Sequence, residues 1–372
     1  MKFPIALLVA SLVVGRELPV CDKSRIRARR NIRTMPSAQV ERYFSAVKQL
    51  NSGPKPTRWD SYALLHRTMF SQIHGTPLFL AWHRMMLYFV EKDLQKIDPS
   101  VTIPYWDWSE SAQTPTQDPA LSKRMFGTSG HGSGSCVTDG KFNNFTVFYW
   151  SDGHQSQHCL IRRPDIFQRP FTTSQAIDRN YLDLNDIAEF GEAIEGVPHG
   201  SAHNNIGGEF STVASAGDPL FYSHHAFVDK LWFDWQNRHR EKFHDYPINP
   251  SQNLSPWNIP IQETLDPASS MCYQYPQERF LYRKPAQQGR AALRFTPEKY
   301  NLPQNLTHAA LMAHARRYIL RGLGPAIRAL DLRIPEPLPV DFLFKMHYNI
   351  AKIREQERKD ALLMAFTDPD QE

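Results

Sequence analysis

Apolar residues recur every three to four positions in three segments of the N-terminal part of the chain, the spacing of one buried face of an α-helix. These segments are 36–50, 58–70 and 77–96. Pro36 and Ser37 stand at the start of the first segment and Pro77 opens the third, and both signals are typical of helix starts. The pattern therefore predicts three helices in this part of the chain.

The periodicity is lost between residues 104 and 180, where glycine, proline, serine and threonine are frequent. Such a composition is typical of long packed loops. Helical spacing returns in three further segments, at 183–196, 198–206 and 218–240. The strongest helical segments suit an antiparallel four-helix bundle, so we expect a mainly α protein with long loops pinned by a disulfide.

The composition changes beyond Tyr275. The segments that follow are a polar stretch at 276–305, an expected helix at 307–322, a proline-rich break at 334–339 and an amphipathic charged helix at 342–365. We therefore expect a single domain over residues 16–275 and a C-terminal helical extension over residues 276–372.

Residues 1–15 have the features of a secretory signal peptide. Lys2 is followed by an apolar run to Val14, and Gly15 offers the small side chain that a cleavage site needs. A buried N-terminal strand is the alternative. The run is too short to cross a bilayer and no later stretch approaches about 20 apolar residues, so we expect no membrane span. Three glycosylation sequons agree with a secreted protein and begin at Asn144, Asn253 and Asn305.

The chain has 372 residues, of which 41% are hydrophobic and 12% aromatic, an ordinary globular composition. Its net charge of +5 is spread over many side chains. The densest basic cluster, residues 25–30, is short and contains no aromatic residue. We therefore expect no nucleic-acid partner.

Four cysteines occur without a CxxC pair or metal-like spacing. In a secreted protein an even number favours disulfides over free buried thiols, which are the alternative. Three pairings are possible. We favour Cys136 with Cys159, which would close a glycine-rich loop, and Cys21 with Cys272, which would tie the N-terminus to the end of the domain.

A first group of histidines comprises His66, His74 and His83. At about 100° per residue, these spacings cannot point all three rings to one side of a single helix. If Pro77 starts a new helix, His66 lies on one helix, His74 in the intervening loop and His83 on the next. The three rings can then converge.

A second group begins with His199 and His203, which share one helical face at i and i+4. The adjacent His224 and His225 follow. Neighbours on a helix point about 100° apart, so we expect only one of this pair to join the group. Asp229, four residues after His225, is either a carboxylate that orients the imidazole or a solvated charge on the helix.

Phenylalanines accompany both groups. Phe79 lies four residues before His83, and Phe221 lies four residues before His225. On a helix this spacing places the two rings against each other. A packed phenyl ring would hold each imidazole in place and keep water out of the site.

Two groups of three histidines favour copper. Structural zinc sites usually contain thiolates, and hydrolytic zinc sites commonly add a carboxylate, which is not evident beside either group. Three ligands leave each metal open coordination, so two Cu(I) ions held close together could each give one electron to O2. A zinc hydrolase is accordingly disfavoured.

The segments that carry these histidines resemble the two copper-binding signatures of the tyrosinase family. HGTPLFLAWHR is similar to the first signature, and PHGSAHNNIGG with DPLFYSHHAFVDKLW is similar to the second. The resemblance extends to PYWDW at 104–108 and CYQY at 272–275, and covers about residues 21–275.

This resemblance implies a type 3 dicopper centre in a four-helix bundle. The ligands that it implies are His66, His74 and His83 for one copper and His199, His203 and His225 for the other, because the second histidine of the adjacent pair ligates in the family. The implied reaction is the oxidation of o-diphenols to o-quinones by O2, sometimes preceded by ortho-hydroxylation of monophenols.

Three positions bear on which of these reactions dominates. Many fungal members carry a cysteine that forms a thioether where this chain has Gln72, so we expect a more mobile His74. Enzymes with strong monophenolase activity often carry an asparagine where this chain has Gly200. Glu195 matches the upstream glutamate that helps a water take the phenol proton, and Asn204 follows the second ligand of the second group. We therefore expect a secreted catechol oxidase, with diphenolase activity exceeding monophenolase activity.

Other interpretations keep the same histidines. An o-aminophenol oxidase, or an oxidase that tailors a fungal phenolic metabolite, would change only the pocket. A hemocyanin-like O2 carrier would have the pocket covered. Long tyrosinases often end in a tail that blocks the copper pocket, but the extension here offers no recognisable plug. The resemblance also implies that Val213, in the loop before Asp218, lies over the copper pair.

Overall fold

The computed structural model describes residue 18 and residues 21–163, 170–276, 337–346 and 348–366. The expected signal peptide, the helix at 307–322 and the sequon at Asn305 lie outside these residues. The sequons at Asn144 and Asn253 lie on exposed residues, and their glycosylation stays a prediction.

The protein is mainly α-helical, as the hydrophobic pattern predicts. The longer helices are α2 (Ser37–Leu50), α3 (Arg58–Ile73), α4 (Phe79–Ile97), α6 (Ile187–Ile194), α7 (Gly200–Ile206), α8 (Leu220–Arg238), α12 (Val340–Lys345) and α13 (Ile350–Phe366). The shorter α-helical and π-helical turns are α5 (Ser174–Ala176), η6 (Ile177–Tyr181), η7 (Glu195–His199), α9 (Gln262–Leu265) and α10 (Pro267–Ser270). The 3-10 turns are Lys23–Arg25, Trp108–Ser111, Pro115–Gln117, Pro119–Leu121, Gly208–Ser211, Ser215–Gly217 and Arg240–Lys242.

The strands are short and form three two-stranded pairs among the described residues. They are β1 (Arg27–Ala28) parallel to β6 (Tyr273–Gln274), β2 (Thr146–Tyr149) antiparallel to β3 (Gln155–Cys159), and β4 (Asn253–Leu254) antiparallel to β5 (Ile259–Pro260). The region between residues 104 and 180 is mostly loop and turn, as expected.

Two predicted helix boundaries need correction. The helix expected at 183–196 begins only at Ile187, because the Asp186 side chain accepts from the backbone N–H groups of the first turn and caps the helix there. The single helix expected at 342–365 is instead divided into α12 and α13. Asn349 accounts for the division, because its side-chain oxygen accepts from the N–H of Lys352 and starts α13.

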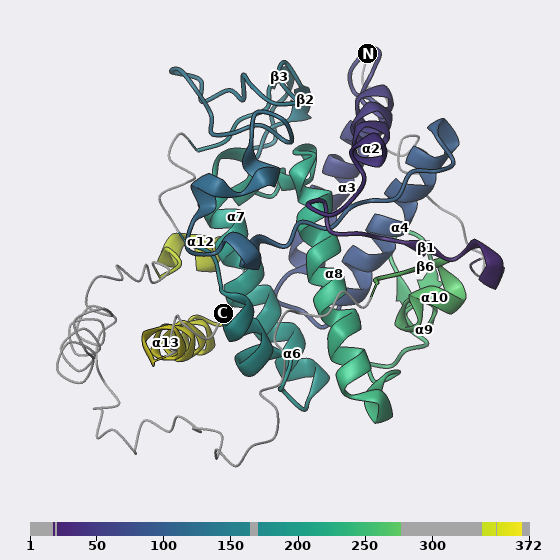
Figure 1. Cartoon of the computed structure of the whole chain (residues 1–372), viewed down its shortest axis with the longest axis vertical. Coiled ribbons are helices and arrows are strands. Elements are labelled where there is room, and N and C mark those ends of the chain that lie inside the picture. The colour runs from purple at the N-terminus through teal and green to yellow at the C-terminus, as the bar shows by residue number, and fades with distance from the viewer. Residues whose placement is uncertain (1–17, 19–20, 164–169, 277–336, 347, 367–372) are drawn as a thin grey trace.

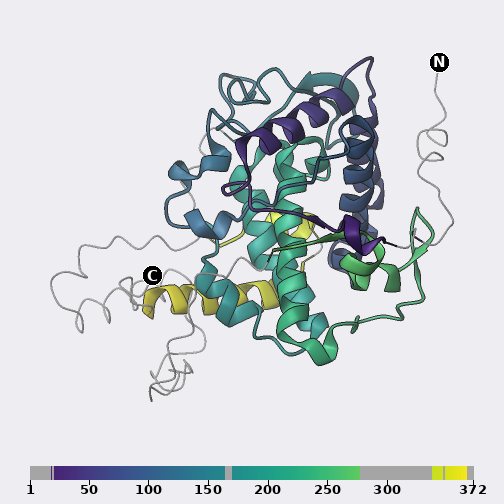
Figure 2. The ribbon, with the colours of Figure 1, turned by 45° about the vertical axis from the view of Figure 1, so that its right-hand side comes forward.

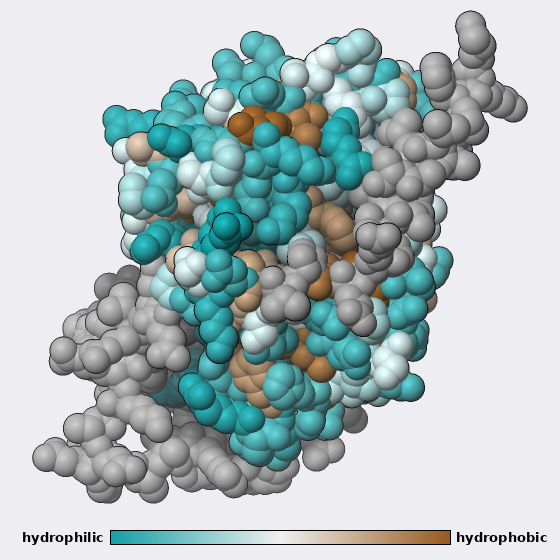
Figure 3. All heavy atoms as spheres, turned by 90° about the vertical axis from the view of Figure 1, so that its right-hand side faces the viewer, coloured by the Kyte–Doolittle hydropathy of each residue, from teal (hydrophilic) through white to brown (hydrophobic). Residues whose placement is uncertain are grey.

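Helices α3, α4 and α8 form the centre of the molecule. Figure 1 shows α8 in the middle, with α4 on one side and α7 on the other. α4 packs against α8, α2 and α3, and most of its residues are buried. The face seen in Figure 3 is mainly hydrophilic, with small separate apolar patches, so the apolar side chains lie mostly in the interior. A regular four-helix bundle stays a prediction.

Both expected disulfides are present. Cys21 is bonded to Cys272 across 251 residues, beside the β1–β6 pair, and therefore ties the N-terminal segment to the end of the predicted domain. Cys136 is bonded to Cys159 across 23 residues and pins the loop region that precedes β3. No helix within the described ranges is long and apolar enough to cross a membrane.

The described part of the C-terminal extension packs on the rest of the protein. α13 contacts α5, α6 and η7, and Figure 2 shows it lying beside α6. The division of the chain into domains at residue 276 stays a prediction.

Candidate metal centre

The first group of histidines converges as the proline-split geometry predicts. His66 lies on α3, His74 directly follows this helix, and His83 lies on α4. The ring centroids of His66 and His74 are 5.1 Å apart, and those of His74 and His83 are also 5.1 Å apart. One ring nitrogen from each residue lies within 4.8 Å of the others.

Each ring of this group is oriented by a backbone carbonyl. The Nδ1 atoms of His66, His74 and His83 lie 3.1, 3.3 and 2.8 Å from the carbonyl oxygens of Val213, Phe70 and Phe79. A carbonyl oxygen can only accept, so Nδ1 carries the proton and Nε2 keeps its lone pair. Among the described residues, the buried Nε2 atoms of His66 and His83 have no hydrogen-bond partner, which suits nitrogens that bind a metal.

The second group comes from η7, α7 and α8. Nδ1 of His199 donates to the carbonyl oxygen of Glu195 over 2.9 Å, and Nδ1 of His203 donates to that of Phe210 over 2.5 Å. Nε2 of His203 lies 3.4 Å from Nε2 of His225. The second group thus presents Nε2 atoms to a common point, as the first group does.

The expectation that only one of the adjacent pair joins the group was wrong for their positions: four histidines gather here, because ligand atoms of His224 and His225 both lie within 4.8 Å of those of His199 and His203. The indole N–H of Trp108 donates to Nδ1 of His224 over 3.1 Å. An indole N–H can only donate, so a neutral His224 carries its proton on Nε2 and has no free lone pair for a metal. This geometry favours His225 as the ligand, and the choice stays a proposal.

All seven histidines are buried and electrically neutral at pH 7. Burial lowers the pKa of His66 to about 4 and that of His203 to about 3, because desolvation penalises the imidazolium. Burial, together with neighbouring histidines, lowers the pKa of His225 well below its usual value. Neutral imidazole is the form that binds metals, so the donor set fits copper without any prior loss of protons.

The phenylalanines pack on the imidazoles as expected. The ring centroids of Phe79 and His83 are 4.9 Å apart, and those of Phe221 and His225 are 4.2 Å apart. The ring centroids of Phe79 and His199 are 4.8 Å apart, so Phe79 contacts both histidine groups and helps to keep water out of the space between them.

A third pair of this kind was not predicted. Phe70 lies four residues before His74, the same spacing that identified the other two pairs, and its ring stacks on the imidazole with centroids 4.2 Å apart. His74 is 1% exposed. The expectation of a mobile His74 rested on Gln72 replacing the thioether cysteine, but Phe70 supplies other support for the ring.

Glu195 lies at the edge of the centre. Its carboxylate is buried and accepts from the backbone N–H of Gly75, next to His74, over 2.7 Å. Burial raises its pKa well above the usual value, against the effect of this hydrogen bond. Glu195 lines a cavity of about 360 Å³, together with Phe79 and Tyr246. Gly200 and Asn204 are both buried on α7.

Neither interpretation of Asp229 was correct. Its carboxylate is buried and accepts from Arg84, from Nη1 of Arg29 at 3.3 Å, and from Oη of Tyr273 and Tyr275 at 2.7 and 2.6 Å. It is therefore neither solvated nor bonded to His225, whose Nδ1 has no hydrogen-bond partner within the described ranges. Sequence spacing could not reveal this cluster, because its members come from distant parts of the chain.

The helical scaffold and the paired histidine groups define a protein that can hold two metal ions side by side. Comparison with known proteins agrees. The family described as the common central domain of tyrosinase matches residues 56–238. A tyrosinase of Streptomyces lincolnensis is 30% identical over 260 residues, which cover 64% of this chain and 91% of that protein. The chain belongs to the tyrosinase family, whose members are type 3 dicopper enzymes.

Other known proteins are similar to the chain in sequence or in fold. The tyrosinase-like protein phomQ1 of Diaporthe leptostromiformis is 35% identical over 233 residues, which cover 55% of this chain and 59% of that protein. A mutant polyphenol oxidase from Thermothelomyces thermophila shares the fold, with a TM-score of 0.58 at 23% identity over 69% of this chain and 90% of that chain. A functional unit of octopus hemocyanin shares it with a TM-score of 0.52 at 21% identity, over 67% and 68% of the two chains.

Proposed function

We propose that the protein oxidises o-diphenols to o-quinones with O2 at two copper ions. His66, His74 and His83 would hold one ion, and His199, His203 and His225 the other. The observation that carries this proposal is the pair of buried histidine groups, in which the Nε2 atoms of His66, His83 and His199 lack hydrogen-bond partners among the described residues. Bound copper would supply the redox chemistry, in which two catechols give up four electrons and four protons and one O2 becomes two waters.

The chain's own residues set the conditions for this chemistry. Phe79 and Phe221 pack on the imidazoles and exclude water. Glu195, held by the N–H of Gly75, can accept a phenol proton at the pocket wall. Gly200 offers no side chain that could help Glu195 to take this proton, and Asn204 follows His203 on α7. We therefore propose that diphenolase activity exceeds monophenolase activity.

The test is turnover by the copper-loaded protein. It should oxidise 4-substituted catechols, and His199→Ala should abolish this activity while circular dichroism shows an unchanged helical content. Full catechol turnover by His199→Ala would contradict the proposal. Fast oxidation of tyrosine after a short lag would show that Gly200 does not limit monophenolase activity.

An o-aminophenol oxidase or a tailoring oxidase of a fungal phenolic metabolite is the second candidate. It is supported by a relative named grixazone synthase in Streptomyces griseus, 26% identical over 289 residues, whose name refers to a particular product. A substrate panel of catechols, monophenols and o-aminophenols separates the two. A hemocyanin-like carrier is the third, because the octopus protein shares the fold, and it predicts reversible O2 binding without quinone.

We also propose that the protein is secreted. The two disulfides support this, because such bonds persist in oxidising compartments. N-terminal sequencing of the protein from culture medium should find a chain that begins near residue 16. Recovery of only the full-length chain from the cell interior would contradict secretion.

A further inference from the structure

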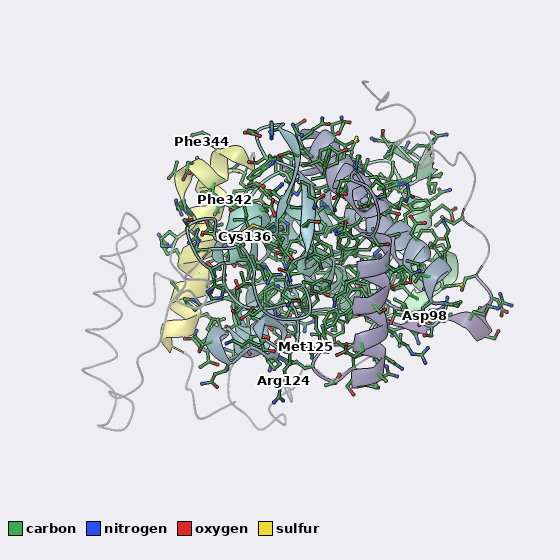
Figure 4. The ribbon with its side chains drawn as sticks, turned by 90° about the horizontal axis from the view of Figure 1, so that it is seen from above. Asp98, Arg124, Met125, Cys136, Phe342 and Phe344 are labelled. Carbon is green, nitrogen blue, oxygen red and sulfur yellow. A yellow bond between two sulfur atoms is a disulfide. The ribbon has the colours of Figure 1, made fainter. Side chains whose placement is uncertain are left out.

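The described C-terminal residues lie against the histidine centre. Seven apolar side chains of this segment are buried: Leu338, Phe342, Leu343, Met346, Tyr348, Ile353 and Ala361. Figure 4 shows Phe344 at the outer side of α12 and Phe342 on the side that faces the body of the protein. Phe344 is 67% exposed and Phe342 is 5% exposed, so α12 has one face packed on the core.

Polar contacts hold the segment in place. The buried Asp360 of α13 accepts from Oη of Tyr181 over 2.5 Å and from the side-chain amide of Asn180 over 2.7 Å. At the other end of α13, Lys352 pairs with Glu192 over 2.5 Å on the surface. A buried, multiply bonded carboxylate is a specific anchor, because moving the helix would leave it without partners.

Tyr348 connects this segment to the metal centre. Its Oη lies 3.1 Å from Nδ1 of His199, which also donates to the carbonyl oxygen of Glu195. Nδ1 is the nitrogen directed away from the metal position, and Nε2 has no hydrogen-bond partner within the described ranges. Tyr348 therefore bonds to the back of the imidazole and leaves the metal-facing side open.

Two glycines of the core make room for the segment. A Cβ at Gly196 would lie 2.0 Å from Cδ1 of Ile353, so Ile353 would have to move. A Cβ at Gly200 would lie 3.3 Å from both Leu338 and Tyr348, closer than ordinary contact. The backbone on either side of His199 thus fits this segment closely.

Tyr348, Asn349 and Ile353 also line a cavity of about 360 Å³ that Gly75 and Leu80 share, and no histidine is among its lining residues. The contact of the segment with the centre is therefore made through His199 and the glycines beside it. We propose that residues 337–346 and 348–366 are a permanent wall of the second histidine group and that Tyr348 is a positioning residue for His199. The inference rests on His199 being a copper ligand, as the proposed function requires.

The test uses the full-length, copper-loaded protein and two matched variants. Tyr348→Phe keeps the ring against Gly200 and removes only the hydroxyl group that contacts His199. Tyr181→Phe removes a hydroxyl group that anchors α13 and contacts no histidine among the described residues. Loss of a hydrogen bond to a metal-binding histidine typically costs 10- to 100-fold in affinity. Because the Glu195 bond remains, we expect Tyr348→Phe to lose copper to a chelator about 10-fold faster.

Copper retention separates positioning from packing. Tyr181→Phe should retain copper as the wild type does, and Tyr348→Phe should lower kcat for 4-tert-butylcatechol with little change in KM. Wild-type copper retention in Tyr348→Phe, or equal losses in both variants, would overturn the positioning role. Because copper is measured without substrate, a wild type that holds two coppers but oxidises no catechol refutes only the proposed function.

Proteolytic cleavage before the C-terminal segment tests whether this segment is a permanent wall of the centre. A protease site inserted between residues 277 and 336 should leave the C-terminal fragment bound and the activity intact. Removal of the fragment by mild denaturant and refolding of the remainder should then lower both copper content and turnover. A tenfold rise in kcat/KM on separation of the fragment would show that the segment inhibits the enzyme and would overturn the proposal.

Discussion

Asp229 should contribute strongly to the stability of this protein, although it binds no metal. Its carboxylate joins α8 to Arg84 of α4 and to Arg29 of the N-terminal segment, and both arginine side chains are 0% exposed. Tyr273 and Tyr275 donate to the same carboxylate. Replacement by asparagine keeps the shape but leaves two buried guanidinium groups without their shared counter-charge.

Removing one partner of a buried ion pair typically costs about 3–5 kcal/mol. Arg29 keeps Glu91 at 3.0 Å and Arg84 keeps the carbonyl oxygen of Thr264 at 2.8 Å, so we expect the lower end for Asp229→Asn, about 3 kcal/mol. Asp183→Asn is the control. Its pair with Arg238 is partly exposed, so its loss should cost less than about 1 kcal/mol.

The measurement is urea unfolding of the metal-free protein at pH 7 and at lower pH. Burial alone would raise the pKa of Asp229, but Arg84 and Arg29 more than offset it and lower the pKa below its usual value. A lowered folded-state pKa stabilises the protein above about pH 4, and this contribution is lost as the pH falls further. The gap between wild type and Asp229→Asn should therefore shrink below about pH 4. Equal unfolding free energies at pH 7 would refute the reasoning.

Three further predictions concern other parts of the molecule. His225→Ala should hold one copper per chain and His224→Ala should hold two, because the indole N–H of Trp108 occupies the lone pair on Nδ1 of His224. Atomic absorption measures the copper content, and the reverse result would mean that His224 is the ligand. Replacing both cysteines of the Cys136–Cys159 bridge by alanine should lower the unfolding free energy by about 3 kcal/mol, since the bridge spans 23 residues, and an unchanged urea midpoint would contradict this. Burial raises the pKa of Asp360 to about 6, so the folded state favours its protonated form. The unfolding free energy should therefore fall by about 3 kcal/mol as the pH rises from 4 to 7. An Asp360→Asn variant whose stability depends on pH as that of the wild type does would contradict this.

Local pattern was sufficient to predict most of the helices and the first histidine group. The spacing of His66, His74 and His83 excluded a single helix, and Pro77 indicated where the second helix starts. Both disulfide pairings were also predicted correctly.

Contacts between distant segments could not be predicted in this way. The choice between His224 and His225 depends on Trp108, which reaches α8 from a loop 116 residues away. The environment of Asp229 depends on Arg29, 200 residues away in sequence. Helical periodicity gives the face on which a side chain lies, but it does not say which distant residue packs against that face.

Gly200 shows how a chemical and a packing explanation can apply to one residue. Family resemblance identifies Gly200 by what it lacks, a side chain that helps to deprotonate monophenols. In the structure, the space that a side chain would enter is bordered by Leu338 and Tyr348 of the C-terminal segment. An asparagine at this position would therefore press on the segment that carries the hydrogen bond to His199. The two effects are separable, because an asparagine that helps to deprotonate monophenols would alter tyrosine turnover alone, whereas a displaced Tyr348 would also weaken copper retention.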